Sequence, residues 1–237
     1  MKNYTKFFLY LYLCITLLAC SKISPKGEIE VKDTPVENFT KLNLKGNFKI
    51  FFAKGEQNLV SVETYPNIFS NLDIDAEDGT LTIEEGRHPE NVDFYTITVF
   101  GKNDLSEITL ADHVEMNISG QIKATQFSLA VKDHAKFMGA VAAQNSYITM
   151  SQKSNANVLG QTKNLNLRMS DSASIVAPYF FVDNLDILAK NDAFAGVNVD
   201  NEMKGAIENT SKLVFYGEPL NKVIKKDKAS VENRKLK

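Results

Sequence analysis

Residues 127–139 read FSLAVKDHAKFMG and contain the unit that decides the fold. The alternating strand Phe127-Ser128-Leu129 leads into a polar corner, Lys132-Asp133-His134, and the small residue Ala135 follows. Gly139 comes a few residues later. Alternation with period two places every second side chain on the same face of a β-strand, so this unit predicts a short strand followed by a tight turn.

The same unit recurs along the second half of the chain. Its copies are Ala111-Asp112-His113-Val114, Lys132-Asp133-His134-Ala135, Lys153-Ser154-Asn155-Ala156, Ser170-Asp171-Ser172-Ala173 and Lys190-Asn191-Asp192-Ala193, with Asn209-Thr210-Ser211 as a frayed sixth copy. Successive copies lie 21, 21, 17 and 20 residues apart, measured at the Val or Ala. A period near 20 made of short strands and polar corners is typical of a β-solenoid, in which each period forms one coil.

We therefore predict an all-β, single-stranded β-helix or β-solenoid with coils of roughly 20 residues, expected to be right-handed. A column of small residues should face inward where the coil narrows: Ala135, Ala156, Ala173 and Ala193. Between Phe39 and Phe100 short alternating runs, bounded by turns such as Gly46-Asn47 and Asp78-Gly79, should form the early coils. A short helical turn is expected within Tyr65 to Asn71.

The first nineteen residues have the pattern of a secretory signal. Lys2 and Lys6 precede an apolar run from Phe7 to Ala19, which is too short to span a bilayer, since that needs roughly 20 apolar residues. The run ends in Leu17-Leu18-Ala19-Cys20, which resembles the lipobox of bacterial lipoproteins. We predict cleavage before Cys20 and acylation of Cys20, so that lipid anchors the protein in a membrane. An uncleaved anchor, or an ordinary signal with a chance cysteine, is the alternative.

The remaining organisation follows from composition. Residues 20–37 are expected to be a lipidated tether, 38–218 the solenoid domain, and 219–237 a charged, solvated tail with contact to anionic lipid or polysaccharide as the alternative. Cys14 lies in the discarded signal, so the mature chain has no disulfide. Without Lys2 and Lys6 it carries 25 basic and 29 acidic residues, a net charge of −4, which argues against nucleic-acid partners.

Asp112, His113, Asp133 and His134 are the first candidates for a site. In a solenoid the two histidines would stack on adjacent coils with the aspartates beside them, and such a group can hold a divalent metal such as zinc. We favour the other interpretation, in which these are corner residues whose short side chains bond the turning backbone, because later copies keep the corner and lose the histidine. No metal or other cofactor is therefore expected. His88 is expected in a loop.

Two further groups of residues have a structural and a functional interpretation. Paired carboxylates could cleave a polysaccharide, but Asp171, Asp186 and Asp192 have the spacing of corner and outward strand positions, and the mature chain's three arginines, Arg87, Arg168 and Arg234, lie far apart. The aromatic residues could form a sugar-stacking surface, although strand spacing favours the core. They are Phe51, Phe52, Phe94, Tyr95, Phe100, Tyr179, Phe180 and Phe181. Pro178 to Phe181 breaks the alternation and should turn at least one ring outward.

The lipobox, the segment 39–50 (FTKLNLKGNFKI), the strand Asp78-Gly79-Thr80-Leu81-Thr82-Ile83 and the late repeats together resemble a known family. The chain is similar to the putative auto-transporter adhesin head GIN domain proteins, which are common as lipoproteins or secreted proteins in Bacteroidota. The resemblance spans roughly Val36 to Gly217. It implies a β-helix-like fold and a role in adhesion, and it offers no catalytic residues.

The hypothesis from the sequence is a non-catalytic, lipid-anchored solenoid of the outer membrane that binds a protein or glycan as an adhesin. Surface lipoproteins of that phylum often carry acidic residues after the lipid-bearing cysteine, whereas Ser21, Lys22 and Ile23 follow Cys20 here. A periplasm-facing lipoprotein with a role in envelope stress or assembly is therefore the alternative, and a polysaccharide-cleaving enzyme is a third. The surface and periplasmic faces stay open at this stage.

Overall fold

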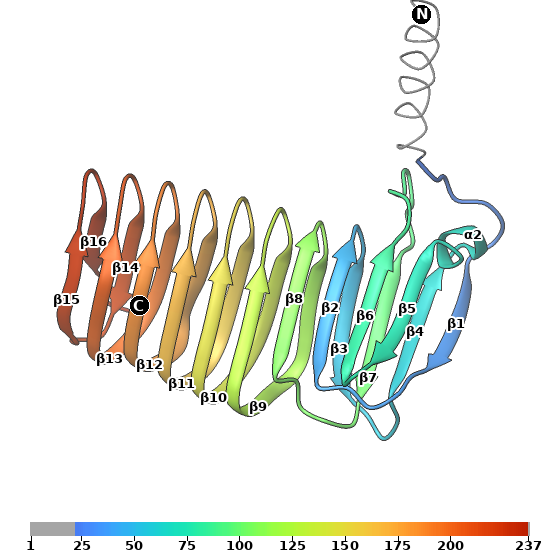
Figure 1. The fold of residues 1–237 in the computed structure, drawn as a ribbon, viewed down its shortest axis with the longest axis horizontal. Coiled ribbons are helices and arrows are strands. Elements are labelled where there is room, and N and C mark those ends of the chain that lie inside the picture. The colour runs from blue at the N-terminus through green and yellow to red at the C-terminus, as the bar shows by residue number, and fades with distance from the viewer. Residues whose placement is uncertain (1–21, 237) are drawn as a thin grey trace, which may run out of the picture.

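The computed structural model describes residues 22–236, which form a β-solenoid of about 7 turns with coils roughly 19 residues apart (Figure 1). The chain is 66% strand and 2% helix, which confirms the predicted fold class. The elements are β1 (Glu30–Pro35), β2 (Lys41–Gly46), β3 (Lys49–Lys54), β4 (Leu59–Thr64), α2 (Pro66–Phe69), β5 (Leu72–Glu77), β6 (Thr80–Glu85), β7 (Thr96–Gly101), β8 (Glu107–Asp112), β9 (Glu115–Val131), β10 (Lys136–Met150), β11 (Asn155–Met169), β12 (Ser174–Ala189), β13 (Phe194–Ile207), β14 (Lys212–Tyr216), β15 (Leu220–Lys225) and β16 (Ser230–Asn233).

The regular part of the solenoid consists of parallel strands stacked in register. Ile148 of β10, for example, pairs with Leu129 of β9 on one side and with Leu167 of β11 on the other. Each of the long strands β9 to β13 bends once in its middle. At the bend in the middle of β11, Gly160 has φ +104°. A Cβ on Gly160 would lie 2.2 Å from the carbonyl oxygen of Val141 on the neighbouring coil. Only glycine fits such a close approach.

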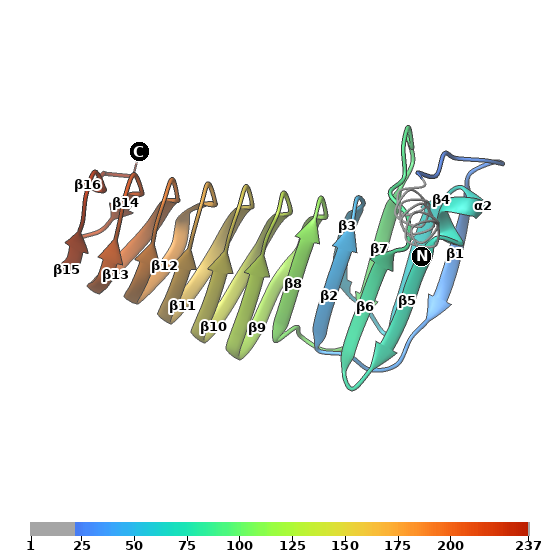
Figure 2. The same ribbon diagram turned by 45° about the horizontal axis from the view of Figure 1, so that its top comes forward.

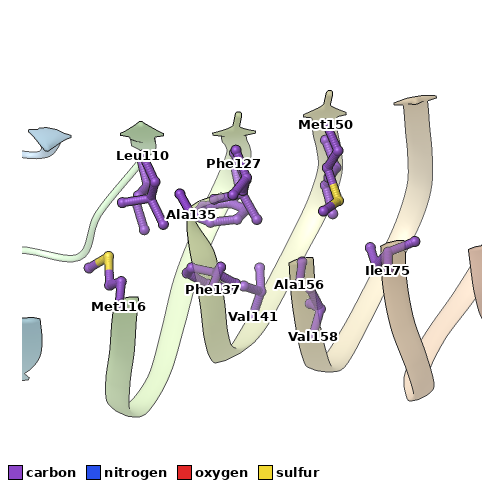
Figure 3. Close-up of a cluster of buried hydrophobic side chains, with 14 of the residues drawn as sticks. Leu110, Met116, Phe127, Ala135, Phe137, Val141, Met150, Ala156, Val158 and Ile175 are labelled. Atoms are coloured by element: carbon purple, nitrogen blue, oxygen red, sulfur yellow. The ribbon is translucent and has the colours of Figure 1, made fainter. Parts of the chain in front are cut away.

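The inward side chains form one continuous apolar core (Figure 3). Figure 3 shows Met116, Phe137, Ala156 and Ile175 on successive coils, where the strand register stacks them, and all four are buried. Burial of every second residue confirms the alternation expected from the sequence. Because each coil buries its apolar face mainly against its neighbours, stability is propagated from coil to coil.

The tight corners lie in one row along the solenoid, which we call the corner ridge. It consists of Gly46-Asn47, Asp112-His113, Asp133-His134, Gln152-Lys153, Asp171-Ser172, Asn191-Asp192, Asn209-Thr210 and Asp227-Lys228. Seven of the leading residues, from Asp112 to Asp227, have φ between +56° and +66°. Asn and Asp tolerate this left-handed conformation better than most residues, which explains the polar corners of the repeat.

The structure corrects the register of the third repeat copy by two residues. Asn155 pairs with Lys136 and with Ser174, so the residue equivalent to Ala135 and Ala173 is Ser154, and the predicted membership of Ala156 in that column is wrong. Ala156 is still buried, one inward position further along. Ala135, Ala173 and Ala193 occupy the column as predicted, and Ser211 continues it as a full copy of the repeat.

The first coils are not stacked in the order of the sequence. The strand order is β4-β7-β3-β9 on one side and β5-β6-β2-β8 on the other, so the coil made by β6 and β7 lies outside the coil made by β2 and β3. The chain then returns past β2 and β3 to begin β8. This arrangement places residues 86–95, which connect β6 to β7, next to the corners at His113, His134 and Lys153, which come much later in the sequence.

An antiparallel cap closes the N-terminal end. β1 pairs antiparallel with β4, β4 with β7, and β5 with β6. The helical turn α2, Pro66–Phe69, lies within Tyr65 to Asn71, where a helical turn was predicted. The expectation of a free tether over 20–37 is wrong for its described part, because Glu30–Pro35 is a strand and Lys26 donates its backbone N–H to the Asn67 side chain.

The other end continues beyond the expected boundary at residue 218. β15 pairs with β13 and β16 pairs with β14, so the segment that we expected to be a solvated tail forms one further coil up to Asn233. Within residues 22–236 no helix is long and apolar enough to cross a membrane.

Candidate ligand-binding cleft

One corner of the solenoid is replaced by a long loop. The strand registers pair Lys45 with Glu84 and Lys49 with Thr96, so Tyr95 is equivalent to Phe48, and residues 85–94 take the place of the two-residue corner Gly46-Asn47. We call residues 86–95 the 86–95 loop. It projects beyond the corner ridge between β6 and β7 (Figures 1 and 2). The prediction that His88 lies in a loop is confirmed.

Hydrogen bonds from the cap hold the loop at both ends. At its start, the Asn71 side chain donates to the carbonyl oxygen of Arg87 at 2.7 Å and accepts the Arg87 backbone N–H at 2.9 Å. At its end, the buried Thr64 hydroxyl donates to the carbonyl oxygen of Phe94 at 2.9 Å. The loop is therefore positioned by the body and not only by its own sequence.

A third attachment involves Asp93. The Tyr65 hydroxyl donates to its carboxylate at 2.7 Å. This hydrogen bond lowers the pKa of the Asp93 carboxyl below its usual value and raises the pKa of the Tyr65 hydroxyl. Asp93 is therefore an ionised, fixed acceptor at the mouth of the loop.

The N-terminal segment binds the back of the loop. Ile23 donates its backbone N–H to His88 and accepts that of Glu90, and its side chain is buried. Lys22 also forms an ion pair with Glu90. The first described residues of the chain are thus part of the structure that supports the loop.

The loop and the corner ridge enclose a cleft of about 770 Å³. Its loop side is lined by Pro89, Asn91, Val92, Asp93, Phe94, Tyr95 and Thr96. Its floor is lined by Asn47, Phe48, Lys49, His113, Glu115, His134, Lys136, Lys153 and Asn155. A cleft of this size, formed by a fixed loop on a rigid scaffold, is the usual form of a binding site for a small molecule or for part of a polymer.

His113 and His134 form part of the cleft floor. Their rings stack with centroids 4.8 Å apart and an angle of 4° between planes, which confirms the predicted stacking on adjacent coils. His88 extends the row, 6.5 Å from His113.

Of the aspartates beside these histidines, Asp133 has the corner role that we favoured. Asp133 accepts the backbone N–H of Asp112 at 3.1 Å. No group of three or more His, Cys, Asp or Glu side chains within residues 22–236 is arranged to hold a metal ion. Metal binding at the His113 and His134 pair stays a prediction.

A half-buried acid, Glu85, lies beside the histidines on the loop side of the ridge. Glu85 accepts the backbone N–H of Asn47 at 2.9 Å, and burial raises the pKa of its carboxyl. Burial and the nearby Glu85 charge also raise the pKa of the Tyr95 hydroxyl. The Glu85 Oε1 atom and the Tyr95 hydroxyl are both buried and interact closely enough to shift each other's pKa, although neither has a hydrogen bond of normal geometry within the described residues.

The other candidate residues are divided between structural and exposed positions. Asp186 forms an ion pair with Arg168 at 2.9 Å, and Asp171 accepts a hydrogen bond from Asn191 at 2.8 Å. Of the aromatic residues, Phe52, Tyr95 and Phe180 are buried, and Phe51, Phe94, Tyr179 and Phe181 are exposed. The broken alternation at Pro178 thus turns two rings outward. Cys20 lies outside the described residues.

The family model described as "Putative auto-transporter adhesin, head GIN domain" matches residues 38–219, which is most of the chain. The chain belongs to this family. The resemblance inferred from the sequence is confirmed. No curated protein matches the chain.

Several solved structures share the fold of this head GIN domain. A putative adhesin from Bacteroides fragilis superposes with a TM-score of 0.76 at 13% identity, over 90% of this chain and 100% of that one. A putative adhesin from Parabacteroides distasonis gives 0.73 at 14% identity, over 90% and 100%. A putative lipid binding protein from the same species gives 0.68 at 15% identity, over 92% and 100%. At these identities the likeness shows the fold.

The sequence reasoning missed the cleft itself. It placed His113 and His134 together, but not Lys49, Phe94 or Lys153 beside them. The available signal was the Gly-, Pro- and Asn-containing stretch 86–91, which separates two strand patterns by more residues than a corner needs.

Proposed function

We propose that this head GIN domain protein is a lipid-anchored adhesin of the cell envelope, whose solenoid binds a protein or glycan without catalysis. The observation that carries the binding role is the cleft between the 86–95 loop and the corner ridge. The loop is fixed by the cap at Asn71, Thr64 and Tyr65, so little conformational entropy is lost when a ligand binds.

Anchoring at Cys20 agrees with the contacts of the N-terminal segment. Ile23, three residues after Cys20, already lies against the loop. Three residues span at most about 11 Å when fully extended, so an acyl chain on Cys20 would hold the body close to the membrane. The lipid would then be attached near the cleft rather than at the end of a long tether.

Catalysis is less well supported than binding. Asp171 and Asp186 both have structural hydrogen-bond or ion-pair partners, and they lie on the ridge and on an outward strand face rather than on one site. A polysaccharide-cleaving enzyme needs two carboxylates facing one glycosidic bond. Asp93 and Glu115 both line the cleft, so the test below includes a search for cleavage products.

The experiment is made in cells that express the full chain. Metabolic labelling with a palmitate analogue should label the wild type and not Cys20→Ala. Proteinase K added to intact cells should degrade the protein while a periplasmic control survives, and deletion of the gene should reduce attachment to glycan- and matrix-coated surfaces. Protection until the outer membrane is broken would overturn the adhesin proposal and favour the periplasmic role in envelope stress or assembly. Release of reducing ends from a polysaccharide panel would favour the enzyme.

A further inference from the structure

We propose that the cleft between the 86–95 loop and the corner ridge binds an acidic saccharide, with Lys49 and Lys153 binding its acidic groups and Phe94 stacking against a sugar ring. This deepens the proposed function and rests on it, because it names the ligand class and the site for an adhesin of unassigned specificity.

The floor of the cleft is a grid of two rows of side chains from four adjacent levels of the solenoid. The ridge row holds Asn47, His113, His134 and Lys153, and the row beside it holds Lys49, Glu115, Lys136 and Asn155. Adjacent levels lie about 4.8 Å apart, so the floor extends over about 14 Å. This spacing is similar to the length of one residue in an extended saccharide, so successive sugars can meet successive coils.

The side chains of this floor that have no ion-pair partner are positively charged. Glu115 is the one carboxylate of the floor, and it forms an ion pair with Lys136 at 2.6 Å. Asp93, which accepts the Tyr65 hydroxyl, is the one carboxylate on the loop side, so three lysines face two carboxylates in the cleft. Among residues 22–236, Lys49 and Lys153 have no carboxylate within ion-pair distance, and both side chains are exposed. Two unpaired ammonium groups at opposite ends of the floor favour a ligand with repeated negative charges.

The neutral groups of the cleft have the chemistry that sugars require. Phe94 is 50% exposed, and its backbone is fixed because its carbonyl oxygen accepts a hydrogen bond from the buried Thr64 hydroxyl. An exposed aromatic face packs on the C–H face of a pyranose. Asn47, Asn91 and Asn155 line the same cleft and supply amides that can both donate to and accept from hydroxyl groups.

The same floor is poorly suited to an acidic peptide. Extended peptides gain much of their affinity by pairing with an unpaired strand edge. The strands under this cleft, β3, β9, β10 and β11, each have a neighbouring strand on both sides. The floor therefore offers a ligand its side chains and no free strand edge, and this favours a saccharide.

The test uses the full lipidated chain in detergent micelles. The probes are hyaluronan and chondroitin sulfate as acidic saccharides, dextran as the neutral saccharide and poly-glutamate as the acidic peptide. The wild type should bind the acidic saccharides and not dextran, and binding should weaken with added salt. Lys49→Gln with Lys153→Gln should weaken binding about tenfold or more, and Phe94→Ala should weaken it without changing the salt dependence.

The matched control is Lys163→Gln with Lys190→Gln, which removes the same charge from exposed positions outside the cleft and should leave binding unchanged. Equal losses in the two double variants, equal binding of dextran, or preference for poly-glutamate would overturn the proposal. If cells attach through this protein and the Lys49 and Lys153 variant attaches equally well, the adhesin function stands and this site is wrong. If the purified chain binds as expected but is protected inside intact cells, the site stands and the adhesin function is wrong.

Discussion

The backbone N–H of Ile23 donates a hydrogen bond to the carbonyl oxygen of His88 at 3.1 Å, and Ile23 and Pro89 form a parallel β-bridge. The Ile23 side chain is 7% exposed. Ile23→Ala should therefore destabilise the protein by about 2 kcal/mol and loosen the 86–95 loop. Urea denaturation and limited proteolysis within the loop would measure both effects. Ile29→Ala is the control, because Ile29 is exposed and its truncation should change stability by less than about 0.5 kcal/mol. Similar effects of the two substitutions would contradict the role of Ile23.

Glu85→Gln should stabilise the protein at neutral pH. Burial raises the pKa of Glu85 in the folded state, so the folded protein binds this proton more tightly than the unfolded chain does. Stability should fall as the pH rises from the usual glutamate pKa to the raised folded value, and the loss should be complete above it. Glutamine can still accept the Asn47 N–H and can donate to Tyr95. We expect a gain of about 1 kcal/mol at pH 7 and almost none at pH 4, measured by urea unfolding at both pH values. A variant less stable than the wild type at pH 7 would refute this.

The corner ridge makes a different prediction at Asn191. Its side chain donates to Asp171 at 2.8 Å and accepts from Asn209 at 2.9 Å, and its backbone is left-handed, with φ +66°. Asn191→Gly should lose the hydrogen bonds but keep the backbone conformation, at a cost of about 1 kcal/mol. Asn191→Ala should also strain the backbone and cost about 2 kcal/mol. Thermal unfolding of the two variants measures the order, and an alanine variant as stable as the glycine variant would count against left-handed strain.

Gly160→Ala should be among the most destabilising single-methyl additions to the solenoid. Its Cβ would meet the Val141 carbonyl oxygen at 2.2 Å, and its φ of +104° disfavours any other residue. Gly196→Ala is the control, since its Cβ would lie 3.5 Å from the nearest side-chain atom. We expect a loss of about 3 kcal/mol or more for Gly160→Ala and less than about 1 kcal/mol for Gly196→Ala, by urea unfolding. If both variants unfolded at the same urea concentration, close coil packing at Gly160 would not be the cause.

The strands could be predicted because a half-buried strand has a period of two, and the corners could be predicted because left-handed turns favour Asn and Asp. The register of the third copy could not. A slip of two residues keeps every inward residue inward, so the alternation around Ser154 and Ala156 fits either alignment. Ser154 fits the column of Ala135, Ala173 and Ala193 because its side chain is small, not because it is polar.

The cleft depends on contacts that no local pattern specifies. His113 and His134 were predicted to be neighbours because they occupy one repeat position. Phe94 and Lys153 are brought together only because the coil of β6 and β7 stacks outside β2 and β3, and this order is a long-range property of the chain. The short stretch Ser21 to Ile23 likewise appeared to be part of a tether, although Ile23 docks on the body.

The corner ridge extends well beyond the cleft, as far as Lys228. The last residue that lines the cleft is Asn155. Each coil from Asn191 onward adds about 19 residues and about 4.8 Å of length, and its strands pair with none of the strands that carry lining residues. Duplication or loss of such a coil in evolution would move the far end of the molecule by a fixed step and leave the cleft unchanged. Reach and recognition are therefore encoded in separate parts of this chain, and natural selection can change one without the other.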